Sequence, residues 1–125
     1  MTQENIVIVD GARTPMGGLS GSLAAVTAPE LASTAIRKVL DRTGISPSLI
    51  EEIFMGCVLP AGLKQGPARQ AARGAGIPDS AGAVTLNKLC GSGMQATIFA
   101  VDSIASGTNT IAMAGGMESM TNAPY

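Results

Sequence analysis

GAVTLNKLCGSGMQATIFAVDSIAS, residues 82–106, is the stretch that decides the fold class. Its first six residues form a short, mostly apolar run, which is typical of a buried strand. From residue 94 to residue 106, small and apolar side chains continue for long enough to predict a helix. A glycine-rich turn that contains Cys90 joins the two. A strand, a tight turn and a helix in this order are typical of an α/β protein with a parallel sheet.

The same alternation continues along the rest of the chain. The predicted strands are residues 5–9, 52–59, 82–87 and 110–116, and the first of them reads as buried on both faces. Helices are predicted from Thr27 to Gly44, at residues 67–76 and at residues 94–106, with a short helical turn at Ser46-Pro47. Thr27 and Glu30 have the spacing of a capping box, and Gly44 ends that helix. We therefore expect a mostly parallel sheet with right-handed crossovers.

Composition limits the classes of function. The chain has 125 residues, the size of one domain, with a net charge of −1 and 14% charged residues, so no basic surface for nucleic acid is expected. The opening MTQENIVIVDG lacks the features of a signal peptide, and no apolar run is long enough to predict a membrane helix. Two cysteines without a secretory signal predict free thiols in a reducing compartment, which favours the cytoplasm.

Cys90 is the candidate catalytic residue. It stands at the predicted start of a helix, at the carboxyl end of a parallel strand, where functional groups of such folds gather. Unpaired N–H groups and the helix dipole favour a thiolate there and can stabilise an oxyanion when the thiolate attacks a carbonyl. Gly91 and Gly93 leave room for a substrate near the backbone. Cys57, within a predicted apolar strand, is expected to be an inert buried thiol.

Two alternatives compete with a nucleophile at Cys90. A lone cysteine is more often a structural, buried residue. Residues 91–96 also fit the dinucleotide fingerprint G-x-G-x-x-A, which needs an acidic residue about 20 positions later. Glu118, the candidate, comes well beyond that position, and the pattern follows the third predicted strand instead of the first. The chain also contains no histidine, so a cysteine nucleophile has no imidazole base within these residues.

Four segments together resemble the thiolases, the acetyl-CoA C-acetyltransferases. Residues 87–96, NKLCGSGMQA, match the family's N-x-x-C-G-S-G-x-x-A at Asn87, Cys90, Gly91, Ser92, Gly93 and Ala96. The other three are VDGARTPMG (9–17), GPARQAARGAGIP (66–78) and AGGMESM (114–120). The resemblance runs from Ile6 to Tyr125 and predicts that residues 1–125 form the N-terminal half-domain of a longer enzyme.

The resemblance implies an α/β, layered thiolase-type fold, with a mixed sheet of five strands between helices and the fifth strand beyond Tyr125. It also implies that Cys90 takes an acyl group from an acyl-CoA as a thioester, which a second acetyl-CoA attacks to give acetoacetyl-CoA. Thiolysis is the reverse reaction, and the chemistry belongs to fatty acid metabolism. Coenzyme A thioesters are substrates, and neither a resident cofactor nor a metal is implied.

The family's histidine and second cysteine lie in later segments, so the resemblance assigns only Cys90 a catalytic role in this chain. The implied partners are acyl-CoA, the C-terminal remainder of a thiolase and further copies in a homodimer or homotetramer, without nucleic acid or membrane. A second hypothesis remains open: a non-catalytic binding or assembly subunit that keeps the motif. The dinucleotide-binding domain is the third.

Overall fold

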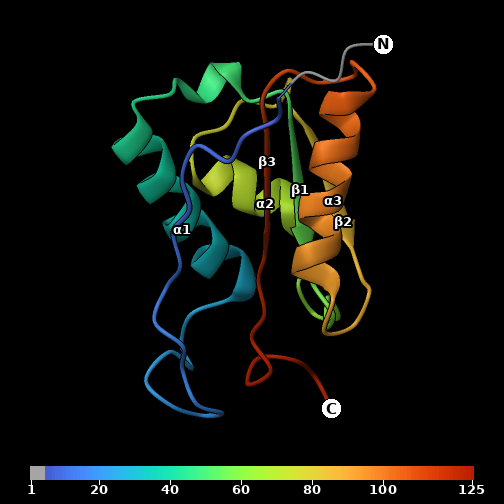
Figure 1. Ribbon diagram of the computed structural model, residues 1–125. Coiled ribbons are helices and arrows are strands. Elements are labelled where there is room, and N and C mark those ends of the chain that lie inside the picture. The colour runs from blue at the N-terminus through green and yellow to red at the C-terminus, as the bar shows by residue number, and fades with distance from the viewer. Residues whose placement is uncertain (1–4) are drawn as a thin grey trace.

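The structure, a computed structural model, describes residues 5–125 (Figure 1). The acidic start, residues 1–4, lies outside the described residues. The elements in chain order are α1 (Ala28–Thr43), the 3₁₀ helix η1 (Pro47–Leu49), β1 (Glu52–Gly56), α2 (Pro67–Gly74), β2 (Gly82–Leu86), α3 (Ser92–Ala105) and β3 (Ala112–Gly116). The predicted alternation of strands and helices is confirmed, as is the α/β fold class.

The described strands form one parallel sheet with the order β2-β1-β3. Helix α3 packs on one face of this sheet, against β1 and β3, while α2 packs against β1 and β2 and carries α1 on its outer side. Figure 1 shows these layers, with α1 and α3 on opposite sides of the strands. The fold is therefore layered, helix–sheet–helix, with every described strand running in the same direction.

Local chemistry explains where α1 begins and ends. The Thr27 hydroxyl accepts the Glu30 N–H at 3.3 Å, and the Glu30 carboxylate accepts the Thr27 N–H at 2.8 Å, which completes the predicted capping box. Gly44 adopts a left-handed φ of 68° and stops the helix, as predicted. Ser33 then anchors α1 to α2, because its buried hydroxyl donates to the Ala71 carbonyl at 2.9 Å.

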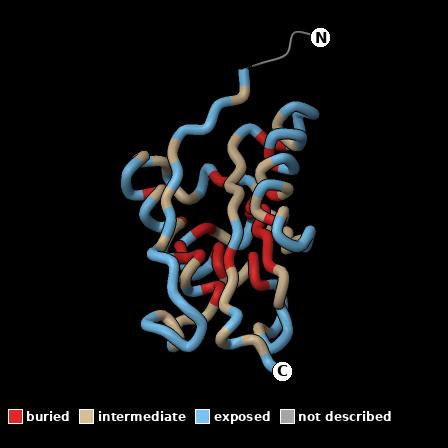
Figure 2. The backbone as a smooth tube through the Cα atoms, turned by 60° about the horizontal axis from the view of Figure 1, so that its bottom comes forward, coloured by how far each residue is buried: buried red, intermediate tan, exposed pale blue. Residues whose placement is uncertain are grey.

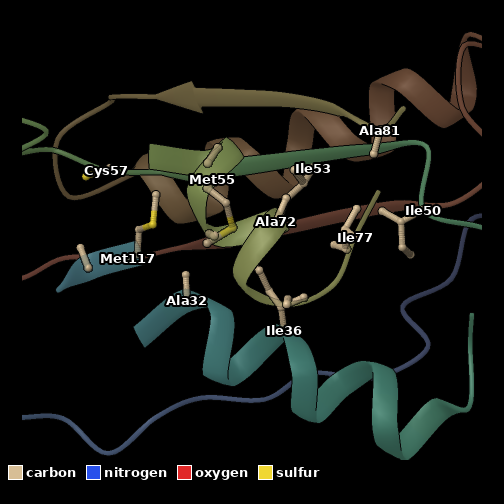
Figure 3. Packing of buried hydrophobic residues seen from close by; sticks show 14 of the residues in the cluster. Ala32, Ile36, Ile50, Ile53, Met55, Cys57, Ala72, Ile77, Ala81 and Met117 are labelled. Atoms are coloured by element: carbon tan, nitrogen blue, oxygen red, sulfur yellow. The ribbon is translucent and has the colours of Figure 1, made fainter. Parts of the chain in front are cut away.

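Alternate residues of β1 supply both layers of the core. Ile53 and Met55 point into the larger cluster, between the sheet and α1–α2, where small alanines of the two helices allow close packing (Figure 3). Phe54 points to the opposite face and contacts Ala96 and Ala100 of α3. The outer face of α3 remains exposed, with Met94 75% accessible. Among the described residues, no helix combines the length and apolarity that crossing a membrane requires.

The prediction of a strand at residues 5–9, buried on both faces, is wrong for this structure. The segment is extended, pairs with none of the described strands and is mostly exposed (Figure 2). Val7, Ile8 and Val9 are all exposed. A cleft of about 680 Å³, lined by this segment, by α1 and by β3, separates it from the sheet. No backbone hydrogen bond joins this segment to the described strands, so it is not part of the sheet. The described sheet consequently has three strands, against the four predicted from the pattern.

Gly56, the last residue of β1, sets how closely α3 approaches the sheet. A Cβ atom at this position would lie 2.7 Å from both the Cβ and the carbonyl carbon of Ser92, and 2.9 Å from the Gly93 nitrogen. Real side chains do not tolerate such distances. The first turn of α3 therefore rests directly on the β1 backbone, and this contact fixes the end of the turn that carries Cys90.

Replacing Gly56 by alanine should lower the free energy of unfolding by about 1–3 kcal/mol, the usual cost of overpacking. Urea denaturation followed by circular dichroism measures the loss. Gly116→Ala is the matched control, because its Cβ would meet Gly93 at an ordinary 3.5 Å. If the two substitutions shift the urea midpoint equally, the close contact at Gly56 is not what sets the approach of α3 to the sheet.

Candidate active site

The segments that follow the strands gather at one edge of the sheet, the lower edge in Figure 1. They are the loop after β1, the turn between β2 and α3, and the tail after β3. The glycine-rich loop before α1 joins them, because Ser20 donates its N–H to the Thr121 hydroxyl at 2.8 Å. The Asn122 side chain also donates to the carbonyls of Ala24 and Val26, at 3.0 and 3.1 Å. Side chains from distant parts of the sequence therefore meet at the carboxyl ends of the strands.

Cys90 lies in the turn between β2 and α3 and is exposed, directly before Gly91, the residue that caps the helix. Two hydrogen bonds from Ser92 hold this turn from inside: its buried hydroxyl accepts the Lys88 N–H at 2.7 Å and donates to the Leu89 carbonyl at 2.6 Å. The Gly91 N–H also donates to the Lys88 carbonyl at 3.0 Å. The turn is thus closed around Cys90 by backbone and side chain together.

Leu89, the residue before Cys90, has a left-handed φ of 50°. This conformation costs a residue with a Cβ about 1–2 kcal/mol, so the surroundings must hold it. The Asn87 side-chain oxygen does so by accepting the Leu89 N–H at 2.8 Å. The strained residue reverses the chain between the strand and the helix, and Cys90 therefore stands in the open at the helix start.

Cys57 has the opposite environment. It follows β1 instead of lying within the strand, is only 1% exposed, and belongs to the larger core cluster (Figure 3). Burial raises the pKa of the Cys57 thiol to about 11, and the negative charge of the nearby Glu118 carboxylate adds to the rise. The thiol lies 3.7 Å from a Glu118 oxygen. Cys57 is thus held in its neutral, unreactive form.

Glu118 lies at the same edge but is engaged with the backbone. Its two carboxylate oxygens accept the N–H groups of Val58 and Leu59, at 2.8 and 3.0 Å. A dinucleotide site would need this carboxylate free to accept ribose hydroxyls. The hydrogen bonds therefore weigh against the dinucleotide interpretation and indicate a structural task for Glu118.

Sequence reasoning named Asn87 and Ser92 as motif positions and considered Glu118 for a dinucleotide site, but it missed the structural role of all three. Serine and asparagine beside a turn often bond the nearby backbone, and that signal was available. The position of Glu118 beside the loop after β1 depends on the pairing of β1 with β3, which the linear sequence does not specify. A Cβ atom at Gly93 would lie 4.0 Å from the Gly116 backbone of β3, so Gly93 also faces the sheet.

Comparisons with known proteins identify the family and the fold. The family model for the thiolase N-terminal domain matches residues 6–125. An acetyl-CoA acetyltransferase of Schizosaccharomyces pombe is 50% identical over the whole chain, and acetyl-CoA acetyltransferase 2 of Arabidopsis thaliana is 52% identical over 96% of it. The crystal structure of Acat5 thiolase from Ascaris suum in complex with coenzyme A superposes with a TM-score of 0.89 and 38% identity.

The chain spans about a third of the length of these proteins: 32% of the S. pombe enzyme, 30% of the A. thaliana enzyme and 30% of the Ascaris chain. The superposition on the Ascaris chain covers 91% of the present chain. Its described residues form a layered α/β fold of the kind seen in that thiolase structure. On the family match, the identities and the shared fold, the chain belongs to the thiolase family, as a counterpart of its N-terminal domain.

Proposed function

We propose that the chain is the acyl-accepting part of an acetyl-CoA C-acetyltransferase, with Cys90 as the nucleophile. The observation that carries the proposal is the placement of Cys90: exposed, held by a closed turn, and at the start of α3. The relatives named as acetyl-CoA acetyltransferases supply the substrate class. The Ascaris thiolase was solved with coenzyme A, which supports a coenzyme A thioester as the ligand.

In the first half of the reaction, the Cys90 thiolate attacks the carbonyl carbon of acetyl-CoA. A tetrahedral oxyanion forms, the bond to the coenzyme A sulfur breaks, and the acetyl group remains on Cys90 as a thioester. Backbone N–H groups at a helix start stabilise both the thiolate and the oxyanion. The released coenzyme A takes up the proton that the thiol lost. Burial and a neighbouring carboxylate suppress the same chemistry at Cys57.

In the second half, a base removes a methyl proton from a second acetyl-CoA, and the resulting carbanion attacks the thioester. Acetoacetyl-CoA forms and the Cys90 thiolate leaves, so the cycle is ping-pong and reversible. The chain has no histidine, and its second cysteine is buried. We therefore place the groups that move these protons in the remainder of a thiolase, and we assign this chain neither a cofactor nor a metal.

Unpartnered apolar surfaces support a need for further protein. Helix α3 exposes Met94, Ile98, Phe99 and Val101, and the segment at residues 7–9 exposes three β-branched side chains. Apolar patches of this kind mark interaction surfaces or cause aggregation. The proposed assembly is the remaining thiolase chain together with further copies of the enzyme, in the cytoplasm.

The two thiols should differ in alkylation. In the assembled protein, iodoacetamide near neutral pH should label Cys90 much faster than Cys57, because Cys57 is buried and neutral. Cys57 should react appreciably only as the pH approaches its raised pKa of about 11. The folded state favours the neutral Cys57 thiol. The contribution of Cys57 to the free energy of unfolding is therefore complete below the ordinary cysteine pKa of 9.0 and is lost as the pH rises through the folded-state pKa of about 11. Peptide mass spectrometry over pH gives both rates, and equal rates at neutral pH would contradict the assignment.

Acetyl-CoA should leave an acetyl group on Cys90, because the thioester is the intermediate of a ping-pong cycle. The readout is a mass increase on the peptide that contains LCGSGM, sensitive to hydroxylamine. Cys90→Ser should abolish this labile label, while Cys57→Ala serves as the control and should keep most of it. Binding of NAD with micromolar affinity in a calorimetric titration would instead support the dinucleotide interpretation.

Residues 1–125 alone should not turn over acetoacetyl-CoA, because general acid–base help worth about 10²–10⁴ in rate is missing. Adding a polypeptide with the remainder of a thiolase should restore solubility and activity together. The assay follows the loss of acetoacetyl-CoA absorbance when coenzyme A is added. Restored solubility without any activity would favour the hypothesis of a non-catalytic assembly subunit. Turnover by residues 1–125 alone would refute the claim that these residues lack the catalytic base.

A further inference from the structure

A path of hydrogen bonds connects Glu118 with the turn that carries Cys90. It begins where the Glu118 carboxylate accepts the N–H groups of Val58 and Leu59. These two residues follow β1, and Glu118 follows β3, so the carboxylate ties together the ends of two adjacent strands. The backbone supports this approach, because the Met117 N–H donates to the Gly56 carbonyl at 2.9 Å.

Asn87 continues the path from the loop to the turn. Its side-chain N–H donates to the Val58 carbonyl at 3.3 Å, and its side-chain oxygen accepts the Leu89 N–H at 2.8 Å. A carboxamide is the side chain that donates and accepts at once in this way, so both ends of Asn87 are used. Leu89 is the strained residue directly before Cys90. Asn87 therefore transmits the position of the loop to the residue that orients the thiol.

We propose that Glu118 is a positioning residue for Cys90, acting through the loop at residues 57–59 and through Asn87. The inference deepens the proposed function and rests on it in one respect, that Cys90 is the reacting thiol. The Glu118 carboxylate is hydrogen-bonded to Cys57, Val58 and Leu59, and not to Cys90 or its turn. Its effect is to fix the loop whose carbonyl holds Asn87, which in turn holds the left-handed conformation of Leu89.

The chemistry of the carboxylate suits this task. Two backbone N–H groups of adjacent residues point to one side chain, and a carboxylate offers two oxygens that both accept. Hydrogen bonds to a charged acceptor are shorter and stronger than those to a neutral one. Glutamine keeps the size of the side chain but replaces one oxygen by an N–H₂ group, which faces a donor. Glu118→Gln therefore removes one of the two hydrogen bonds to the backbone with little change in side-chain volume.

Glu51 provides a matched control at the opposite edge of the sheet. Its carboxylate accepts the Thr110 N–H at 2.7 Å, a bond of the same type just before β3. Glu51→Gln removes the same charge and weakens the same kind of contact, at the amino ends of the strands. A general loss of stability or charge affects both variants, whereas a positioning effect on Cys90 appears only in the Glu118 variant.

The first measurement is amide hydrogen exchange in the assembled protein. In Glu118→Gln, exchange at the Leu89 amide should rise about tenfold, the effect expected from weakening a charge-assisted hydrogen bond. Glu51→Gln should raise exchange at Thr110 and leave Leu89 unchanged. No increase at Leu89 in the Glu118 variant, or an equal increase in both variants, overturns the proposal.

The second measurement tests the path through Asn87. In an Asn87→Ala background the Leu89 amide has already lost its acceptor, so adding Glu118→Gln should give no further rise in exchange. If Glu118→Gln multiplies the exchange rate by the same factor with and without Asn87, the two residues act independently and the proposed path is wrong.

The third measurement asks whether the path matters for the thiol. The rate of Cys90 alkylation by iodoacetamide should fall about tenfold in Glu118→Gln, for the same hydrogen-bond reason, and stay near the wild-type rate in Glu51→Gln. Faster exchange at Leu89 with an unchanged alkylation rate would show a structural residue and overturn the positioning role. None of these measurements uses acyl-CoA. Failure of acetyl transfer to wild-type Cys90 would therefore count against the proposed function alone.

Discussion

The contact between the first turn of α3 and the β1 backbone at Gly56 is the constraint on which the site depends. It brings the helix start down onto the carboxyl ends of the strands, since no side chain stands between them. The turn before α3 then has to reverse direction within a few residues, which forces Leu89 into its left-handed conformation. Ser92 and Asn87 stabilise that reversal through the backbone. Close packing thus produces an exposed thiol at a helix start.

The same edge of the sheet gives its two thiols opposite properties. Cys57 lies in the core, where burial and the charge of Glu118 keep it neutral, while Cys90 stands in solvent a short turn before a helix. Glu118 interacts with Cys57 and also with the loop that leads to the Cys90 turn. Its carboxylate disfavours the Cys57 thiolate and at the same time bonds the loop that contacts Asn87. One side chain therefore connects the inert cysteine with the turn of the exposed one.

The helices, the three paired strands and the exposed cysteine follow from local patterns in the sequence. The capping box at Thr27 and the left-handed Gly44 are encoded within a few residues, and so their predictions were correct. The segment at residues 5–9 has strand chemistry, but a strand also needs a partner, and the pattern does not say whether one is within reach. The role of Glu118 depends on the register between β1 and β3, a tertiary property. The role of Glu118 is thus one that the linear sequence does not specify, because it acts between elements.

The separation of the two thiols determines how the protein responds to oxidants. Peroxide converts an accessible thiolate to a sulfenic acid, which is rescued when a second cysteine condenses with it to form a disulfide. Cys57 is poorly suited as that resolving cysteine, because it is buried and stays protonated at neutral pH. The chain has no third cysteine. These 125 residues therefore supply no thiol suited to reduce an oxidised Cys90, and an external thiol such as glutathione has to do so. Without an external thiol, oxidation proceeds to the irreversible sulfinic acid.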